Sequence, residues 1–314
     1  MHPANESGAA RLVRRIRLNW AIGRTQGFDR LLDEKEELNP VARGAHAARK
    51  WRWRRAHGGA RGDAVPVFLF GVQRSGTNMV TRGLATSPAF EVYNEANAAA
   101  FHRYVLRPDP VIRSLVDNSR HAYVLFKPLC DSHRVTELLD DLGTRKAGTA
   151  LWAYRDVDGR VRSALAHFGT NNLEVLREIA AGGGNDRWQA RGMSAANREL
   201  VASFDYSAMT PESAAALFWY VRNSLFFDQG LDERDDVILV SYNALLADPQ
   251  PTMTAMCALL DVTYDSAFVR HIGARSPRVA APLAIDPRVR AHCDELEARL
   301  SAVAARHVSR LTMQ

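Results

Sequence analysis

Between residues 67 and 84 a short apolar run passes directly into a glycine-containing loop and then into a stretch with helical spacing. The run Val67-Phe68-Leu69-Phe70 is typical of a strand that is buried on both faces. The loop Gly71–Asn78 follows it and opens a helix that we expect over Ser75–Thr86. Glycines let a backbone wrap around an anion, and the free amides at a helix N-terminus point at it. The sequence therefore predicts a phosphate-binding loop.

Apolar runs of the same kind recur along the chain, separated by stretches with helical spacing. We expect further strands over Tyr123–Phe126, Ala150–Tyr154, Val237–Val240 and Phe90–Tyr93. The predicted helices are Glu95–Leu106, Ser132–Leu142, Val157–His167, Pro211–Gln229, Gln250–Leu260 and Pro287–His307. Strands that alternate with helices indicate a parallel sheet that is covered on both faces. The expected fold class is therefore α/β, a P-loop-like three-layer sandwich.

The basic character of the chain is confined to its beginning. Residues 1–62 contain 14 Lys and Arg against 6 Asp and Glu, whereas the rest of the chain is nearly neutral. This segment includes the basic and aromatic run 49–55, and glycines at 58, 59 and 62 follow it. We expect a basic, partly helical extension over 1–62 and one domain over 63–314.

The composition of the chain limits the cellular compartment and the kinds of site that we expect. The chain has no run of about 18 apolar residues, so no membrane span is expected. Cys130, Cys257 and Cys293 are widely spaced and form no CxxC pair, which argues against both a disulfide framework and a zinc site. A reducing cytoplasm and a reaction without a metal ion are the expectations that follow.

The loop differs from that of ATP-binding proteins at two informative positions. Gly71 and Gly76 have the spacing of the first two glycines of an ATPase phosphate loop. The position of the ATPase lysine is Thr77, and the position of the magnesium ligand is Asn78. The loop has an arginine instead, Arg74, which argues against an ATP-dependent kinase.

The run Arg74-Ser75-Gly76-Thr77 resembles the 5′-phosphosulfate loop of sulfotransferases that use 3′-phosphoadenosine-5′-phosphosulfate, abbreviated PAPS. Three later segments resemble further donor-binding segments of this family, in the same order along the chain. They are Arg155 with Ser163, which resemble the 3′-phosphate motif; Ser241-Tyr242-Asn243, with Tyr242 as a nucleotide contact; and Arg275-Ser276, which resemble a loop that covers the adenosine. The resemblance spans about residues 65–282 and implies PAPS as donor, the bisphosphate PAP as product, and no metal.

Sulfuryl transfer needs a base for the acceptor hydroxyl and cations for the transferring group and the leaving oxygen. The resemblance to the tyrosylprotein and related bacterial branch implies Glu95 as base, Lys127 at the leaving oxygen and Arg74 at the transferring group. Lys127 follows a predicted strand, at the end where open sheets bind ligands. Glu91 is an alternative to Glu95 as the base, but the alternation of side chains along the predicted strand favours a structural role for it. His102 and His133 remain alternatives, because another branch of the family uses a histidine.

The acceptor is not readable from the sequence, since phenols, carbohydrates and tyrosine all present a hydroxyl. A small molecule or glycan is the expected partner, with no nucleic acid, and the N-terminal extension is a candidate arm for homo-oligomer formation. Two alternatives stay open: a nucleotide-dependent kinase on the same fold, and a non-catalytic module whose basic extension binds a nucleic acid or an anionic surface.

Overall fold

The computed structural model describes residues 40–184, 186–272 and 283–313 of the chain. It divides into two compact units, Met1–His57 and Gly58–Gln314. In the first unit the described element is helix α3, Pro40–His57, which has no acidic residue. Arg55 lies over the ring of Trp51 at 4.8 Å from its centroid, and Trp51 is half exposed.

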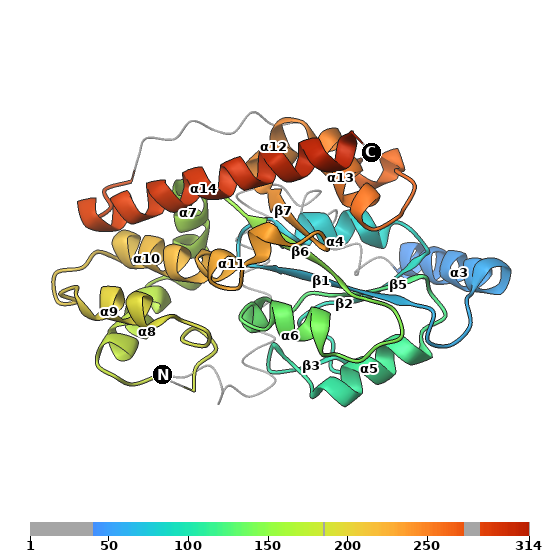
Figure 1. Ribbon diagram of the computed structural model, residues 1–314, viewed down its shortest axis with the longest axis horizontal. Coiled ribbons are helices and arrows are strands. Elements are labelled where there is room, and N and C mark those ends of the chain that lie inside the picture. The colour runs from blue at the N-terminus through green and yellow to red at the C-terminus, as the bar shows by residue number, and fades with distance from the viewer. Residues whose placement is uncertain (1–39, 185, 273–282, 314) are drawn as a thin grey trace. The chain divides into compact units, whose positions relative to one another are not determined.

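The second unit is built on a five-stranded parallel sheet in the order β2-β5-β1-β6-β7 (Figure 1). Its strands are β1 Val65–Gly71, β2 Phe90–Tyr93, β5 Tyr123–Phe126, β6 Thr149–Tyr154 and β7 Val237–Ser241. The strand order reverses at β1, because the chain builds β2 and β5 on one side of it and then β6 and β7 on the other. Ligands of open α/β sheets bind outside the carboxyl ends of the strands at such a reversal.

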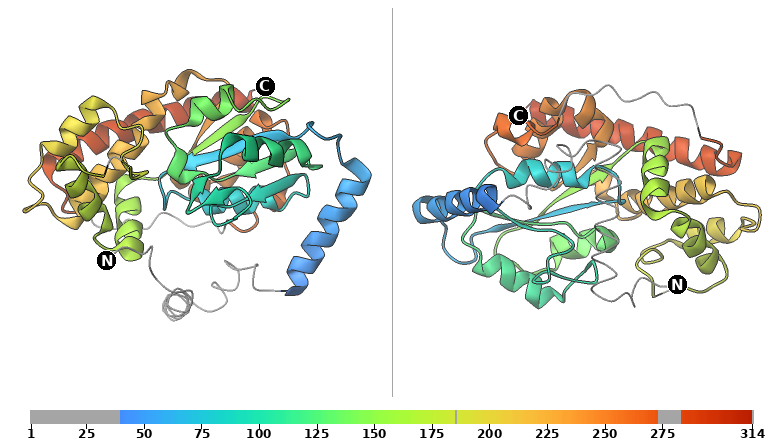
Figure 2. Two further views of the ribbon diagram at one scale, coloured as in Figure 1. Left: turned by 90° about the horizontal axis from the view of Figure 1, so that it is seen from below. Right: turned by 180° about the vertical axis from the view of Figure 1, so that it is seen from behind.

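Helices follow the strands and cover the sheet. The α-helices are α4 Thr77–Ala85, α5 Asp109–Asn118, α6 Val135–Asp140, α7 Val157–Phe168, α8 Asn171–Ala180, α9 Ala195–Ala202, α10 Pro211–Asn223, α11 Leu225–Asp228, α12 Tyr242–Ala247, α13 Pro249–Leu259 and α14 Pro287–Thr312. Short 3-10 helices span Leu129–Asp131, Leu231–Glu233 and Ser266–Phe268. In Figure 2, α8, α9 and α10 gather at one end of this unit. None of the described helices is long and apolar enough to cross a bilayer.

Alternate strand residues feed two separate cores, one on each face of the sheet. Val67 and Leu69 pack with residues of α4, α12 and α13, whereas Phe68 and Phe70 pack with residues of α5, α6 and α10. All four side chains are fully buried. A strand that is buried on both faces has no polar positions, which is why it is a continuous apolar run in the sequence. The α/β fold expected from the sequence, with a parallel sheet between two helical layers, is therefore confirmed.

The predicted helix over Glu95–Leu106 is wrong. After β2 the chain makes turns and then a two-stranded antiparallel hairpin, β3 Phe101–His102 and β4 Val105–Leu106. Asn97 favours a turn here, because its side chain accepts a hydrogen bond from the amide of Ala99 at 2.9 Å. Glu95 therefore lies in a turn and not at a helix N-terminus.

Two other predicted helices are shorter or broken, and several helices were not predicted. Residues 132–142 contain only α6, and the stretch 211–229 is divided at Ser224 into α10 and α11. The unpredicted helices are α5, α8, α9 and α12. They are short, with six to ten residues, and periodicity is weakly defined over so few turns.

Candidate active site

The parallel arrangement brings one group from each strand to the same edge of the sheet. Glu95 follows β2, Lys127 follows β5, the loop Gly71–Asn78 follows β1, Arg155 follows β6 and Tyr242 follows β7. The register aligns these ends: Tyr93 pairs with Phe126, Gly71 with Ala153, and Tyr154 with Ser241. The predicted site residues of the described chain therefore lie along one edge.

The loop after β1 has an unusual backbone. Gly71, Arg74 and Gly76 have φ values of 128°, 74° and 86°. Positive φ costs a glycine little, but it strains a residue with a Cβ. Arg74 is one of four such residues among the non-glycine residues that the structure describes. Backbone strain in a loop at the carboxyl edge of a sheet is typical of functional sites.

Both glycines are also required by close packing. A Cβ atom on Gly71 would overlap the carbonyl oxygen of Ala153 in β6. A Cβ atom on Gly76 would overlap the ring of Tyr242 at the start of α12. The phosphate loop is therefore held between the neighbouring strand and the Tyr242 ring.

The polar groups of this loop fit an anionic ligand. Helix α4 begins at Thr77, and the described backbone hydrogen bonds give no acceptor for the amides of Gly76, Thr77 and Asn78. The Ser75 hydroxyl is buried and has no hydrogen-bond partner among the described residues. Buried polar groups are normally paired, so an unpaired hydroxyl beside free helix amides indicates that a ligand supplies the partner. A phosphate would satisfy all of these groups.

A second cationic group stands at the end of β6. The guanidinium of Arg155 lies over the Tyr242 ring, 4.5 Å from its centroid. The carboxylate of Asp156 is 3.7 Å from Arg155 Nε and caps α7 by accepting from the Gly159 amide. The indole of Trp219 donates to the Arg155 carbonyl at 2.9 Å. Arg155 is thus fixed by stacking beside the loop glycine Gly76.

The two predicted phosphate sites touch each other. Arg74 Nε donates to the hydroxyl of Ser163 at 2.9 Å, which joins the loop to the second turn of α7. Ser163 was predicted with Arg155 and Arg74 with the loop, so the sequence motifs fall in one continuous cluster. Arginine and serine are both donors to phosphate oxygens, and one ligand with two phosphates could bridge them.

The third cluster contains the predicted base and lysine. Lys127 is buried, and its Nζ donates to Asn78 Oδ1 at 2.6 Å. The same Nζ is 3.4 Å from Glu95 Oε1, while the Glu95 side chain is 30% exposed. A buried ammonium beside the phosphate loop and a solvent-accessible carboxylate thus form an ion pair. The carboxylate can accept a proton from a group that approaches from solvent.

The rival bases are placed differently. Glu91 accepts from Tyr93 Oη at 3.0 Å and from Ser119 Oγ at 2.7 Å, so it has the structural role expected for it. His102 is exposed on β3. Burial, together with Arg222 and Arg191, lowers the pKa of His133 to about 4, so this ring is a weak base. Neither histidine has a described contact with Lys127 or Asn78.

Further observations concern two tryptophans, the predicted covering loop, possible metal ligands and the cysteines. Trp152 and Trp219 are fully buried in the core. Arg275 and Ser276, the predicted covering loop, lie outside the described residues. Within the described part of the chain no group of three or more His, Cys, Asp or Glu is arranged to hold a metal ion. The three cysteines are buried free thiols.

Two residues at the site were missed by the sequence analysis in the role they have here. Asn78 was assigned to the phosphate loop, but its side chain also holds Lys127. Arg160 is fully buried and donates to the carbonyl of Gln73 at 3.4 Å, in the phosphate loop. A sequence signal existed for Arg160, because it shares the buried face of α7 with Val157, Val161 and Ala164.

The chain was compared with protein-family models, curated proteins and solved structures. No family model and no curated protein matches the chain. A sulfotransferase from Alicyclobacillus acidocaldarius is 17% identical, with 79% of this chain and 96% of that chain covered and a TM-score of 0.41. The sulfotransferase domain of the Synechococcus PCC 7002 olefin synthase is 16% identical, with 80% and 95% covered and a TM-score of 0.38. Both are named for the class that the sequence motifs resemble, but at these values the functional assignment rests on the site residues.

Proposed function

We propose that the protein is a sulfotransferase that moves a sulfuryl group from PAPS to an acceptor hydroxyl. The observation that supports this most strongly is the continuous cluster of the phosphate loop, Ser163, Arg155 and Tyr242, because it offers two adjoining sets of phosphate donors. PAPS and its product PAP carry phosphates at both the 5′ and 3′ positions. A nucleoside triphosphate has no 3′-phosphate that could bind to the second set of phosphate donors, Arg155 and Ser163.

The donor is bound through its two phosphates. The amides at the start of α4 and the Ser75 hydroxyl hold the 5′-phosphate, with no magnesium ligand required. Arg155 and Ser163 hold the 3′-phosphate, since a guanidinium fork and a hydroxyl match a phosphate dianion. Tyr242 keeps Arg155 beside the loop by stacking.

The acceptor is activated by Glu95. Its carboxylate takes the hydroxyl proton as the acceptor oxygen bonds to sulfur and the bond from sulfur to the 5′-phosphate oxygen breaks. Lys127 stabilises the negative charge that develops on the leaving oxygen, and Arg74 stabilises the charge on the transferring group. The ion pair between Lys127 and Glu95 holds base and cation 3.4 Å apart, so both act on one reacting centre.

Glu95→Gln tests this assignment. The amide keeps the shape of the side chain but cannot accept a proton, so turnover of PAPS should fall by about 10²–10⁴-fold with PAP binding retained. Formation of PAP is measured by chromatography across phenols, sugars and tyrosine peptides, with ATP and Mg²⁺ as a parallel donor. Glu91→Gln is the matched control and should keep its turnover.

Equal turnover in wild type and Glu95→Gln would remove Glu95 as the base. Phosphorylated acceptor formed from ATP, with no PAP formed from PAPS, would replace the sulfotransferase proposal by a kinase.

A further inference from the structure

Arg160 is a fully buried cation behind the phosphate loop. Its side chain comes from the first turns of α7, it is 0% exposed, and its guanidinium lies over the Phe218 ring at 5.2 Å from the centroid. Its hydrogen bonds go to neutral groups: the carbonyls of Ala215 at 2.9 Å and Gln73 at 3.4 Å, and the amide oxygen of Asn172 at 3.4 Å. The remaining nitrogen, Nη2, has no partner among the described residues.

No described carboxylate pairs with this charge. The other buried arginine, Arg222, has Asp131 among its charged neighbours, whereas the charged neighbour of Arg160 is Arg74, another cation. Arginine stays protonated at neutral pH, and a buried charge without a counter-charge is strongly destabilising. Arg160 therefore has a cation as its charged neighbour and no described anion to balance its own charge.

The position of Arg160 indicates what balances it. It contacts the loop at Gln73, and one helical turn further along α7 Ser163 contacts the next loop residue, Arg74. Arg160 and Ser163 therefore contact the loop on the side where the two sets of phosphate donors join. An anion in this loop would be attracted by Arg160 through its fixed charge, without touching it.

We infer that the phosphates of the bound donor are the counter-ion of Arg160, which makes Arg160 a positioning residue that couples donor binding to the stability of the fold. The inference rests on the proposed function. It adds that part of the donor affinity comes from a charge that cannot reach the ligand. A buried site of this kind is screened little by salt, so the attraction persists at high ionic strength.

The test compares three replacements of Arg160. Arg160→Gln keeps a hydrogen-bond donor and loses the charge; Arg160→Lys keeps the charge; Arg160→Met removes both. Arg222→Met is the burial-matched control, because Arg222 is 3% exposed and donates to the carbonyls of Trp188, Gln189 and Arg191, away from the loop. Calorimetry measures PAP and AMP affinity, and thermal unfolding measures the ligand-free proteins.

We expect Arg160→Gln to bind PAP roughly tenfold or more weakly, because a unit charge that attracts the phosphates through a medium of low effective dielectric constant is lost. The loss should be smaller for AMP, which has one phosphate. Arg160→Lys should retain more affinity than Arg160→Gln, and ligand-free Arg160→Gln should unfold at or above the wild-type temperature, since an unbalanced buried charge has been removed. Arg222→Met should keep wild-type PAP affinity.

Several results would overturn the inference. Wild-type PAP affinity in Arg160→Gln would do so while leaving the proposed function intact. The inference would also fail if the PAP affinities of the variants followed their unfolding temperatures and Arg160→Lys bound PAP no better than Arg160→Gln. Arg160 would then have only a packing role. If Arg160→Met does not fold, the comparison of Gln with Lys decides alone. Failure of the wild type to bind PAP would remove both the proposed function and the inference.

Discussion

At the scale of single residues, the site is held together by contacts between groups that are far apart in sequence. Tyr242 fills the space that the missing side chain of Gly76 leaves, and the Arg155 guanidinium lies over the same ring. The residue types at these positions were predictable from motifs, because each type follows from phosphate chemistry. The contacts between them were not, since stacking of Tyr242 on Gly76 depends on how β7 sits in the sheet.

Arg155→Ala should weaken PAP by about 1.5–3 kcal/mol, roughly ten- to hundredfold, because a hydrogen bond to a charged group is lost. Affinity for AMP, which lacks the 3′-phosphate, should be nearly unchanged. Calorimetry with both ligands measures the difference. The control is Arg145→Ala, which removes an arginine that is 69% exposed and paired with Asp63. An equal loss for PAP and AMP would contradict a 3′-phosphate role.

At the scale of elements, the strands were easier to predict than the helices. Continuous apolar runs mark strands that are buried on both faces, and the predicted strands are present. The helix predicted after β2 was wrong, although the spacing of this segment is compatible with a helix. Asn97 and the hairpin turn instead favour turns and two short strands. Glu95 was thus identified by its distance along the chain from the loop, although the element around it was wrong.

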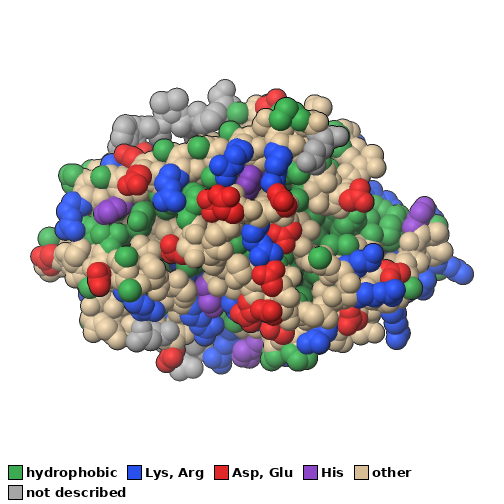
Figure 3. All heavy atoms as spheres, in the orientation of Figure 1, with side chains coloured by type: hydrophobic (Ala, Val, Ile, Leu, Met, Phe, Trp, Pro, Cys, Tyr) green, Lys and Arg blue, Asp and Glu red, His purple; other side chains and the backbone are tan. Residues whose placement is uncertain are grey.

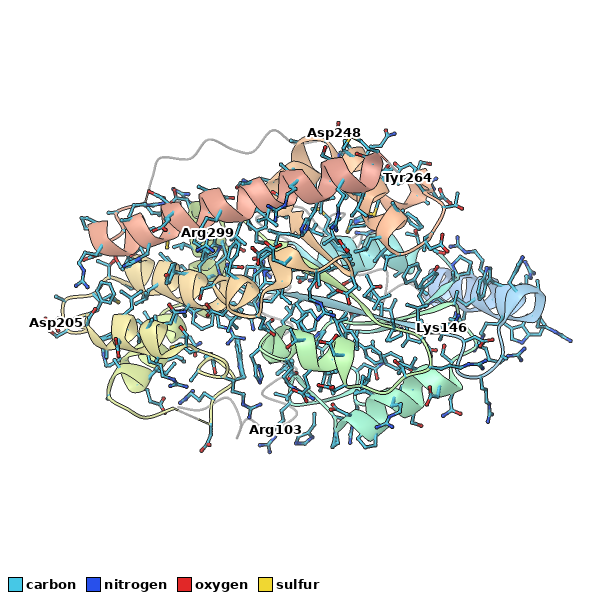
Figure 4. All side chains as sticks on the ribbon, viewed as in Figure 1. Arg103, Lys146, Asp205, Asp248, Tyr264 and Arg299 are labelled. Atoms are coloured by element: carbon cyan, nitrogen blue, oxygen red, sulfur yellow. The ribbon has the colours of Figure 1, made fainter. Side chains whose placement is uncertain are left out.

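The β3–β4 hairpin turns on two residues with positive φ, Arg103 at 50° and Tyr104 at 70°. Arg103 lies at the lower edge of the unit in Figure 4 and is exposed. Such turns favour Asn followed by Gly, and positive φ costs other residues about 1–2 kcal/mol each. Glycine also loses more conformational entropy on folding, which offsets part of this gain, so Arg103→Asn combined with Tyr104→Gly should raise the free energy of unfolding by about 1–2 kcal/mol in urea titrations.

Arg61→Asn, at an exposed position without positive φ, is the control for the hairpin variant and should change stability little. An unchanged or lowered free energy of unfolding in the hairpin variant would show that the turn is not strained.

Helix α14 is fastened to the sheet through a neutral histidine. His307 Nδ1 accepts from the Leu239 amide of β7 at 3.1 Å, and burial, with Arg310 and Arg306, lowers the pKa of His307 to about 4. In the unfolded chain the imidazole of His307 has its ordinary pKa near 6.5. The contribution of His307 to the free energy of unfolding is therefore complete above pH 6.5. It falls as the pH drops toward 4, by up to about 1.4 kcal/mol per pH unit.

His307→Gln keeps an acceptor that does not titrate, so the fall in unfolding free energy between pH 6.5 and 4 should become shallower. Chemical denaturation at several pH values measures it, with the exposed His167→Gln as control. If the free energy of unfolding of His307→Gln fell as steeply between pH 6.5 and 4 as that of the wild type, His307 would not contribute to the pH dependence of stability.

At the scale of the whole molecule, the second unit is a scaffold that delivers one functional group from each of five parallel strands to one edge. On the face shown in Figure 3, acidic and basic side chains are mixed, with no extended field of one sign. Under the proposed function, the charge of the donor is therefore balanced locally, by Arg74, Arg155 and Lys127 after the strands and by Arg160 on α7. The fold class and the placement of the predicted site residues at the carboxyl edge of the sheet were predictable, because both follow from the periodicity of the sequence. The acceptor was not, because one fold supports many substrates.

Calorimetric titration of the wild-type protein with PAP, and separately with ATP and Mg²⁺, tests the central claim that this edge is a two-phosphate site. We predict one PAP bound per chain, with a dissociation constant of roughly micromolar or below, near −8 kcal/mol. ATP with Mg²⁺ should bind at least tenfold more weakly. Binding of ATP with Mg²⁺ that is tighter than that of PAP, or no binding of PAP, would contradict the account.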